Sequence, residues 1–474
     1  MNTTNTSAKT NAKVGEQFDT ISAIATGIGA GIGIIRLSGI NAVAVADKIF
    51  RHAGGQKLAD LPSYRAAYGH IVDCDGNPAD EVIALVMRAP KSYTTEDVVE
   101  LQCHGGIAVL RQVLQLTYAA GARPAERGEF TKRAFLHGRL DLAQAQGVMD
   151  VVSAKTNPAL QAAQARLAGR LSAAVEKIRG KILALSAHLA AVIDFPEDDV
   201  PEVTAAEVTA ALTPLIEQTK LLLSRASWGR ILRDGISTAI VGKPNVGKSS
   251  LLNFLAGEER AIVTDLPGTT RDSIEANIEL GSVMLRLIDT AGIRAAREQV
   301  EQIGVERAKA QASAAQLILA VFDGSRPLDA EDKAIIELLD GKNAIVIINK
   351  RDLTPCFSLA ELRTKLPAET VVCHISTRER EDIKKVSDAV YRAVGLTSEL
   401  PDNLVLVAEE EQANKLGQGL NHLQAALDAT RKNIGWDFAA IDLRSAWEVL
   451  GEITGDTAPD EIISQVFAKF CVGK

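Results

Sequence analysis

The sequence predicts a protein of three parts: an α+β domain at the N-terminus, a helical domain built from two separated segments, and an α/β domain inserted between them. Changes in the hydrophobic pattern along the chain lead to this prediction. Short β-like runs alternate with Gly/Pro turns up to about Gly138, whereas 140–193 is rich in Ala, Leu, Gln and Lys at helical spacing. That helical character returns from about Asn403 to Phe470. Because the two termini of a domain often lie close together, insertion of one domain into another is the simplest explanation.

The chain of 474 residues is long enough for two or three domains that each bury a core. We place the N-terminal domain at 1–138, the two helical parts at 139–232 and 396–474, and the insert at 233–395. Pro158 predicts a break between helices. The acidic segment 194–201, with its two prolines, is interpreted as a solvated linker, which we prefer over a metal site.

The N-terminal segment combines strand-like runs, such as 82–87 and 98–101, with a glycine-rich stretch. The four glycines of that stretch do not fit GxGxxG, so they predict a tight turn entering a strand and not a dinucleotide site. They are Gly27, Gly29, Gly31 and Gly33. Arg36 and Glu100 are single charged residues in apolar surroundings, and from the sequence alone each is interpreted as a surface charge or a member of a structural ion pair.

The inserted segment contains an octapeptide at 242–249, Gly-Lys-Pro-Asn-Val-Gly-Lys-Ser, that fits GxxxxGK[ST]. A buried strand is predicted at 236–241 and a helix after Lys248, so that backbone N–H groups point at a bound anion where the helix begins. Lys248 would supply a positive charge to the β- and γ-phosphates of a nucleotide, and the Ser249 hydroxyl would bind Mg²⁺. The octapeptide therefore predicts a phosphate-binding loop.

Three further motifs follow in order, each behind a strand-like apolar run. They are Asp289-Thr290-Ala291-Gly292, Asn349-Lys350-Arg351-Asp352 and Ile375-Ser376-Thr377. The Asp352 carboxylate can accept hydrogen bonds from N1–H and the 2-amino group of guanine, a donor pattern that adenine lacks. The set therefore predicts GTP as the nucleotide.

The residue that orients the attacking water in many small GTPases is missing. These proteins carry glutamine directly after the first of the three motifs, whereas this chain has Ile293, and an apolar side chain cannot orient water. No arginine finger can be assigned from the sequence either. Asn245 offers another route, because its side-chain oxygen could help to hold a K⁺ ion that neutralises developing charge; the alternative is an ordinary turn-forming asparagine.

The motif set resembles that of the MnmE (TrmE) tRNA-modification GTPases. The resemblance runs from about Asp19 to Lys474, and it includes the switch segment 264–272. Other matching segments are GIIRLSG at 33–39, YTTEDVVEL at 93–101, GEFTKRAFL at 128–136 and FCVGK at 470–474. The resemblance implies a folate-binding α+β domain at the N-terminus, a discontinuous helical domain and an inserted, Ras-like P-loop GTPase domain.

The resemblance also implies the residues of the nucleotide site. GTP would be bound by Asn245, Val246, Gly247, Lys248, Ser249, Ser250, Thr264, Asp265, Leu266, Pro267, Gly268, Thr269, Thr270, Asp289, Thr290, Ala291, Gly292, Asn349, Lys350, Asp352, Ser376 and Thr377. K⁺ would be held by Asn245, Thr264, Thr269 and the carbonyl of Leu266, and Mg²⁺ by Ser249 and Thr270. Glu301 would replace the missing glutamine as the catalytic residue that orients water; the alternative is an ordinary carboxylate of a switch helix.

In this family the N-terminal domain binds 5-formyl- or methylene-tetrahydrofolate as a one-carbon donor. The matching positions are Arg36, Glu100, Arg139 and the terminal Lys474. Family members usually carry lysine where Arg139 stands, so the charge is kept while the hydrogen-bonding geometry differs. Cys471 falls near the expected modification site, where a catalytic thiolate is one interpretation and a packed or idle thiol is the other.

By resemblance the chain is expected to be a homodimeric, K⁺-stimulated GTPase. Its cycle would drive G-domain dimerisation and a conformational change in a complex with a flavoprotein, MnmG (GidA), which alone would bind FAD. Together they would place an aminomethyl or carboxymethylaminomethyl group on C5 of the wobble uridine in certain tRNAs, with folate as the carbon source. Two alternatives stay open: a ribosome-assembly GTPase of the Era/EngA kind, and a one-carbon enzyme regulated by GTP.

Composition narrows the setting of this function. Charged residues make up 24% and apolar residues 46%, which is typical of a globular protein. The net charge of −8 gives no general basic character, so contact with tRNA would need a local patch. The five cysteines form no CxxC pair, and no apolar run reaches the roughly 18 residues of a membrane span. We therefore expect a cytoplasmic protein that makes no contact with a membrane.

Overall fold

The computed structural model describes residues 19–194, 203–262, 276–288, 310, 312–396 and 405–474. These residues form two compact units, which we describe separately. The first contains Met1–Met149, Arg166–Thr219 and Lys415–Lys474, and the second contains Asp150–Ala165 and Lys220–Asn414. The mixture of sheet-containing and purely helical parts agrees with the predicted fold class.

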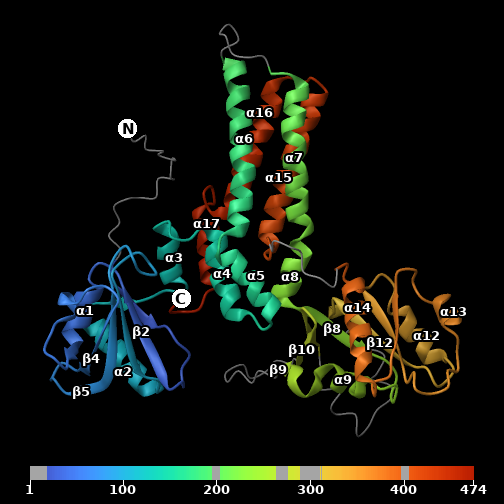
Figure 1. Cartoon of the computed structure of the whole chain (residues 1–474), viewed down its shortest axis with the longest axis horizontal. Helices are drawn as coiled ribbons and strands as arrows, with labels where there is room; N and C mark the ends of the chain where they lie inside the picture. The colour runs from blue at the N-terminus through green and yellow to red at the C-terminus, as the bar shows by residue number, and fades with distance from the viewer. Residues whose placement is uncertain (1–18, 195–202, 263–275, 289–309, 311, 397–404) are drawn as a thin grey trace. The chain divides into compact units, whose positions relative to one another are not determined.

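The N-terminal part of the first unit is a seven-stranded sheet in the order β3-β4-β5-β6-β2-β1-β7 (Figure 1). Neighbouring strands are antiparallel except for the β1–β7 pair. The strands are β1 Ile21–Ile24, β2 Ile32–Ser38, β3 Phe50–His52, β4 Arg65–Val72, β5 Pro78–Met87, β6 Val98–His104 and β7 Arg123–Pro124. The helical elements are α1 Ala42–Ile49, η1 Leu58–Asp60, α2 Ile107–Ala119 and α3 Glu129–Leu136. The expected strands at 82–87 and 98–101 and the glycine turn before β2 are confirmed.

Alternation along β2 and β6 divides the side chains between the two faces of this sheet. Ile35 and Leu37 of β2 belong to the core that α1 and α2 cover, together with Val99 and Leu101 of β6. Arg36 pairs with Glu100 in the register between these two strands, so both point to the opposite face. The sheet therefore presents this charged pair on the face away from its main core.

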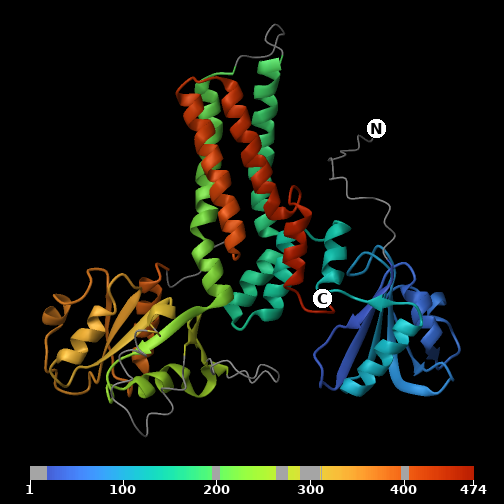
Figure 2. The same cartoon turned by 180° about the vertical axis from the view of Figure 1, so that it is seen from behind.

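The helical part of the first unit is a bundle in which α6, α7, α15 and α16 lie side by side (Figures 1 and 2). Its helices are α4 Leu142–Ser153, α6 Arg170–Asp194, α7 Ala205–Ser224, α15 Glu410–Arg431, α16 Trp436–Thr454 and α17 Asp460–Ala468, whereas α5 Asn157–Leu167 lies mainly in the second unit. Arg179 of α6 is buried against the ring of Trp447 in α16, with its guanidinium carbon 4.4 Å from the ring centroid. Helices from both flanks of the insert thus pack together.

Two expectations about this part can be compared with the structure. The break between helices near Pro158 is confirmed, because α4 ends at Ser153 and Pro158 lies in the first turn of α5, where proline is tolerated. Of the acidic segment 194–201, all residues after Asp194 lie outside the described residues. Among the helices that the structure describes, none is both long and apolar enough to span a bilayer.

The second unit contains a seven-stranded sheet in the order β14-β13-β12-β8-β11-β10-β9. The strands from β14 to β11 run parallel, while β10 is antiparallel to β11 and β9. The strands are β8 Ile236–Val241, β9 Ala261–Ile262, β10 Ala276–Leu280, β11 Val283–Leu287, β12 Leu317–Asp323, β13 Ala344–Asn349 and β14 Val371–His374. The helical elements are α8 Ala226–Asp234, α9 Lys248–Arg260, α12 Ala330–Glu337, α13 Leu359–Arg363, η2 Arg380–Asp382 and α14 Ile383–Ala393.

Apolar cores cover both faces of this sheet, as in a doubly wound α/β domain. Along β8, Ile236 and Ile240 belong to one core, and Ala239 and Val241 belong to the other. The strand predicted at 236–241 is confirmed as β8, and the strand-like apolar runs expected before Asp289 and within 344–349 form β11 and β13. In such sheets ligands bind beyond the carboxyl ends of the strands, so a binding site is expected among the loops after β8, β12, β13 and β14.

Candidate functional site

The loop between β8 and α9 requires its two glycines. Gly242 has φ +155° and Gly247 has φ +102°, and a Cβ added to them would lie 2.6 Å from the Val321 carbonyl oxygen and 2.2 Å from Asn349 Nδ2, respectively. Any larger residue would therefore displace β12 or the Asn349 side chain. Asn245, between them, is also left-handed, with φ +65°, a conformation that asparagine tolerates better than most residues.

Lys248 begins α9 and folds back over the loop. Its Nζ donates hydrogen bonds of 2.7 Å to the carbonyl oxygens of Gly242 and Lys243. Burial lowers the pKa of this ammonium group. Ser249 and Ser250 are exposed in the first turn of the same helix. A positive side chain, hydroxyl groups and the N-terminus of a helix thus meet at one point, a combination that binds phosphate.

Asn349, the last residue of β13, joins three loops. Its Nδ2 donates to the carbonyl oxygen of Val246 at 3.0 Å, and its Oδ1 accepts from the amide of Thr377 at 3.3 Å. Only 2% of Asn349 is exposed, so both bonds form away from water and are costly to break. Asn349 therefore fixes the phosphate loop relative to the loops that follow β13 and β14.

Asp352 lies beside the loop after β14. Its Oδ1 accepts from the Ser376 hydroxyl at 2.9 Å, and its Oδ2 lies 3.2 Å from Arg378. The Ser376 hydrogen bond, helped by the charge of Arg378, holds the pKa of this carboxyl below its ordinary value. Asp352 is therefore an ionised acceptor with a fixed orientation, as recognition of the N1–H and 2-amino donors of guanine requires.

Lys350 is tied to the end of the neighbouring strand. It is left-handed, with φ +64°, and its Nζ donates to Asp323 Oδ2 at 2.6 Å. Asp323 ends β12 and pairs in register with Asn349 at the end of β13. Neither Asp323 nor Arg378 was predicted from the sequence as a site residue, although Asp323 follows an apolar run as the other site residues do.

The structure thus brings one group of predicted nucleotide-binding residues together at the carboxyl edge of the sheet. They are Asn245, Val246, Gly247, Lys248, Ser249, Ser250, Asn349, Lys350, Asp352, Ser376 and Thr377. The other predicted residues lie outside the described residues: Thr264, Asp265, Leu266, Pro267, Gly268, Thr269, Thr270, Asp289, Thr290, Ala291, Gly292 and Glu301. Of the predicted cation ligands, only Asn245 and Ser249 are therefore described. Within the described ranges, no group of three or more His, Cys, Asp or Glu side chains is arranged to hold a metal ion.

A second polar cluster lies on the N-terminal sheet. Arg36 Nε donates to Glu100 Oε1 at 2.9 Å, so the structural ion pair proposed as one interpretation of these residues is present. The Arg36 guanidinium carbon is 5.6 Å from the ring centroids of both Tyr93 and Phe130, and that of Arg139 is 4.9 Å from Tyr93. Two guanidinium groups, a carboxylate and an aromatic ring are thus within reach of one ligand.

The C-terminal tail packs against this cluster. Arg36 Nη1 donates to the carbonyl oxygen of Gly473 at 3.3 Å, and Val472 forms an antiparallel bridge with Arg127. Gly473 has φ +93°, and a Cβ there would lie 2.2 Å from the carbonyl oxygen of Ile24. Lys474 therefore follows directly on a residue that touches the cluster. Cys471 is an exposed free thiol whose carbonyl accepts from the Gly128 amide at 3.3 Å.

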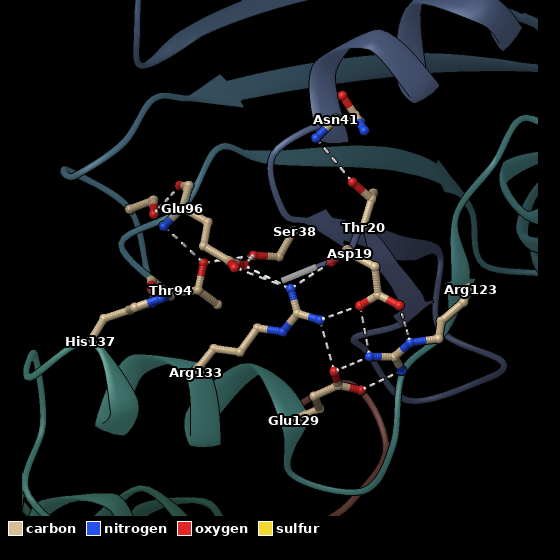
Figure 3. Close-up of polar contacts among 11 residues, drawn as sticks. Asp19, Thr20, Ser38, Asn41, Thr94, Glu96, Arg123, Glu129, Arg133 and His137 are labelled. Atoms are coloured by element: carbon tan, nitrogen blue, oxygen red, sulfur yellow. Dashed lines mark hydrogen bonds and ion pairs between the residues drawn. The ribbon is translucent and has the colours of Figure 1, made fainter. Parts of the chain in front are cut away.

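A buried ion network around Arg133 joins α3 to Asp19 and to the loop that contains Glu96 (Figure 3). Only 1% of Arg133, in α3, is exposed, and its guanidinium bonds to Glu129 at 2.8 Å, to both oxygens of Glu96 at 3.1 Å and to Asp19. Arg123 bridges Asp19 and Glu129 from the exposed side. This network was not predicted from the sequence, although Glu129 and Arg133 of the GEFTKRAFL segment have the i, i+4 spacing that is typical of an ion pair on a helix.

The same network holds the loop that carries Tyr93. Glu96 accepts from the Ser38 hydroxyl at 2.6 Å, and Ser38 in turn bonds to the Thr94 hydroxyl at 2.6 Å. Thr95, which lies between Thr94 and Glu96 in the sequence, has φ +64°, an unfavourable conformation for a β-branched residue. Strain of this kind persists only where neighbouring contacts impose it, so the loop conformation depends on these hydrogen bonds.

Two protein-family models match the chain. The model described as the GTP-binding protein TrmE N-terminus matches residues 20–139, and the model of the MnmE helical domain matches residues 142–471, which is more than two thirds of the sequence. The chain belongs to the MnmE family. The second match runs through the inserted domain, so both flanks and the insert lie within one family model.

Individual relatives cover almost the whole chain. A protein of Alkaliphilus metalliredigens, named tRNA modification GTPase MnmE, is 44% identical over 96% of this chain and 99% of its own length. A protein of Geobacillus kaustophilus with the same name is 46% identical over 97% of this chain and 100% of its own length. Among solved structures, the G domain of the T. maritima FeoB iron transporter is 22% identical, covers 33% of this chain and 98% of its own, and has a TM-score of 0.25.

Proposed function

We propose that this chain hydrolyses GTP, stimulated by K⁺, in order to drive modification of the wobble uridine of certain tRNAs. Family membership supports the first part directly: the chain is a GTP hydrolase. The observation that carries the proposal is that Asn349, Asp352, Ser376 and the phosphate loop meet at the edge of one sheet, an arrangement that suits guanine. The remaining parts rest on the family and on the second cluster.

The phosphate loop fits a nucleotide with its metal ions. Its glycines leave a cradle that a Cβ would fill, and Lys248 and the start of α9 supply positive charge. Asn245 and Ser249 would supply oxygen ligands to K⁺ and Mg²⁺, with Thr264, Leu266, Thr269 and Thr270 as further predicted ligands. These cations, when bound, neutralise charge on the phosphates. We assign Glu301 the task of orienting the water.

The second cluster fits a reduced folate. The pterin ring presents an amino group and an adjacent ring N–H, and a carboxylate such as Glu100 can accept hydrogen bonds from both. Its planar ring can stack with Tyr93, and Arg36, Arg139 and Lys474 supply positive charge for the carboxylates of the glutamate tail. We therefore propose 5-formyl- or methylene-tetrahydrofolate as the ligand; the folate, when bound, supplies the one-carbon unit.

The partners follow from this chemistry. We assign the redox step to the FAD-dependent partner, MnmG (GidA), and the addition of the aminomethyl or carboxymethylaminomethyl group at C5 to the complex of this chain with that partner. The GTPase would act as a timing switch in a homodimer, with G-domain dimerisation driven by the nucleotide cycle. We assign a folate-binding and dimerisation domain to 1–138, helical parts to 139–232 and 396–474, and the G domain to 233–395.

We place this function in the cytoplasm. All five cysteines are free thiols, and two of them, Cys103 and Cys373, are buried, where burial raises the pKa of Cys103 to about 12 and of Cys373 to about 11. Free thiols in every position are typical of a reducing compartment. Cys471 is exposed and near the folate cluster, and a Cys471→Ser variant that keeps full modification activity would exclude a catalytic thiolate there.

Calorimetric binding of 5-formyltetrahydrofolate to the full-length chain tests the proposal. We expect saturable binding that Arg36→Ala abolishes. Arg111→Ala is the matched control, because Arg111 is an exposed arginine on α2, which covers the other face of the sheet. Absence of binding in a protein that still hydrolyses GTP would contradict the folate site and leave a ribosome-assembly GTPase of the Era/EngA kind in contention. Folate turnover without the flavoprotein would instead favour a one-carbon enzyme regulated by GTP.

A further inference from the structure

A buried carboxylate lies beneath the loop that follows β14. Asp382 is 1% exposed, and its Oδ2 accepts the Ser376 backbone N–H at 2.8 Å. The Asp382 Oδ1 lies 2.7 Å from Lys385 Nζ, and the Asp382 Oδ2 lies 3.2 Å from Arg351 Nη2. A carboxylate this deeply buried is stable only when it is paired and hydrogen-bonded, and these three donors meet that requirement.

One of these three donors, Ser376, belongs to the predicted guanine site, and a second, Arg351, lies next to it. Arg351 directly precedes Asp352 in the chain, and Ser376 donates its hydroxyl to Asp352. Asp382 therefore holds the backbone of the residue that orients the Asp352 carboxylate, and also the side chain next to Asp352. One buried group thus joins the loop after β13 to the loop after β14.

A purely structural role would be the capping of α14, since Asp382 occupies the N-cap position of that helix. Aspartate is a favoured N-cap because its side chain accepts a backbone N–H of the first helical turn. Here the Asp382 side chain makes no such cap hydrogen bond. It turns instead toward Ser376, on the loop that borders the nucleotide site.

We infer that Asp382 is a positioning residue that sets selectivity for guanine by fixing Ser376 and, through it, Asp352. The inference rests on the proposed recognition of guanine by Asp352. Without Asp382, the Ser376 amide loses its acceptor and the two cations lose their buried counterion, so Ser376 no longer directs Asp352 at the base. The loss should fall on recognition of the N1–H and 2-amino group of guanine, the proposed donors to Asp352, and less on the phosphates.

Equilibrium binding of GDP and inosine diphosphate (IDP), which lacks the 2-amino group, to the full-length chain tests this inference. In the wild-type protein we expect GDP to bind about 10- to 100-fold more tightly than IDP, the range for one hydrogen bond to a charged group. In Asp382→Ala we expect this ratio to fall by up to about tenfold, because GDP loses two hydrogen bonds to Asp352 whereas IDP, which keeps the N1–H, loses one. Asp382→Asn keeps the shape of the side chain but replaces one acceptor oxygen with a donor. Its GDP-to-IDP ratio should lie between those of the wild type and Asp382→Ala, and this variant carries the test if the alanine variant does not fold.

Glu379→Gln is the matched control. Glu379 also pairs with Arg351, but its side chain is 46% exposed and does not bond to the Ser376 amide. We expect its GDP-to-IDP ratio to equal that of the wild type. A wild-type ratio in the Asp382 variants, or an equal loss of GDP and IDP binding, would overturn the positioning role alone. A wild-type protein without preference for GDP would overturn the proposed guanine recognition as well.

Discussion

Replacement of Arg133 by methionine is expected to destabilise the N-terminal domain strongly. The guanidinium of Arg133 is 1% exposed and bonds to Asp19, Glu96 and Glu129. Methionine keeps much of the volume but removes every one of these bonds. Glu129 keeps its contact with Arg123, whereas Glu96, whose side chain is 10% exposed, keeps only the Ser38 hydroxyl and the surrounding loop. Removal of one partner from a buried ion pair costs about 3–5 kcal/mol.

Native-state hydrogen exchange measures this cost where it arises. A chain with several domains has no single free energy of unfolding, so a global melting curve would mix independent transitions. Exchange instead reports the opening free energy of each segment. We expect the amides of β1, β2 and α3 to lose about 3–5 kcal/mol of protection. The amides of β12 and β13, in the other compact unit, serve as the internal reference and should not change.

Arg123→Gln is the control for this experiment. Arg123 pairs with Asp19 and Glu129 (Figure 3), which are also partners of Arg133, but the Arg123 side chain is 40% exposed. Solvent-exposed ion pairs contribute about 0–1 kcal/mol, so this variant should change protection only slightly. Adding Glu96→Gln to Arg133→Met should recover part of the loss, because it removes the uncompensated charge. Equal losses for the two arginine variants, or a loss below about 1 kcal/mol for Arg133→Met, would refute the reasoning.

Three further predictions concern the nucleotide site. Glu301→Ala should leave GTP affinity unchanged and lower turnover by roughly 10²–10⁴-fold in a steady-state phosphate-release assay, and an unchanged rate would remove Glu301 from the mechanism. Gly247→Ala should weaken GDP binding roughly tenfold or more, since its Cβ would displace Asn349, whereas Gly180→Ala, in open space on α6, should have no effect on a binding titration. Burial lowers the pKa of Lys248 in the free protein, and the phosphates of bound GDP raise it. GDP binding is therefore accompanied by proton uptake between these two pKa values, and GDP affinity should fall as the pH rises above the pKa of Lys248 in the free protein. A GDP affinity that does not change with pH in calorimetry would contradict this prediction.

The described part of the candidate nucleotide site was predictable because its signals are local. The phosphate loop, Asn349 and Ser376 each follow an apolar run that forms a strand of one parallel sheet, and the carboxyl ends of such strands meet at one edge. A strand and the motif directly behind it can be read within about ten residues of sequence. Asp382 was not predictable in this way, because its role depends on the tertiary contact with Ser376 and Arg351.

The N-terminal cluster shows the limit of such inference. Arg36 and Glu100 become neighbours only because β2 pairs with β6 in one particular register, 64 residues apart in sequence. The tail reaches them through Gly473, across 437 residues. Arg133 was missed because arginine is rarely buried, and nothing in the sequence states that α3 packs it against Asp19 and Glu96. Only the family resemblance singled out Arg36 and Glu100 as a ligand site.

Reconstituted tRNA modification tests the central claim most directly. The full-length chain, the flavoprotein partner, tRNA, K⁺, GTP and tetrahydrofolate with an isotope-labelled methylene carbon are incubated together, and the tRNA nucleosides are analysed by mass spectrometry. We predict label on C5 of the wobble uridine with GTP, and none with a non-hydrolysable GTP analogue. Equal labelling with the analogue, or labelling without this chain, would contradict the account.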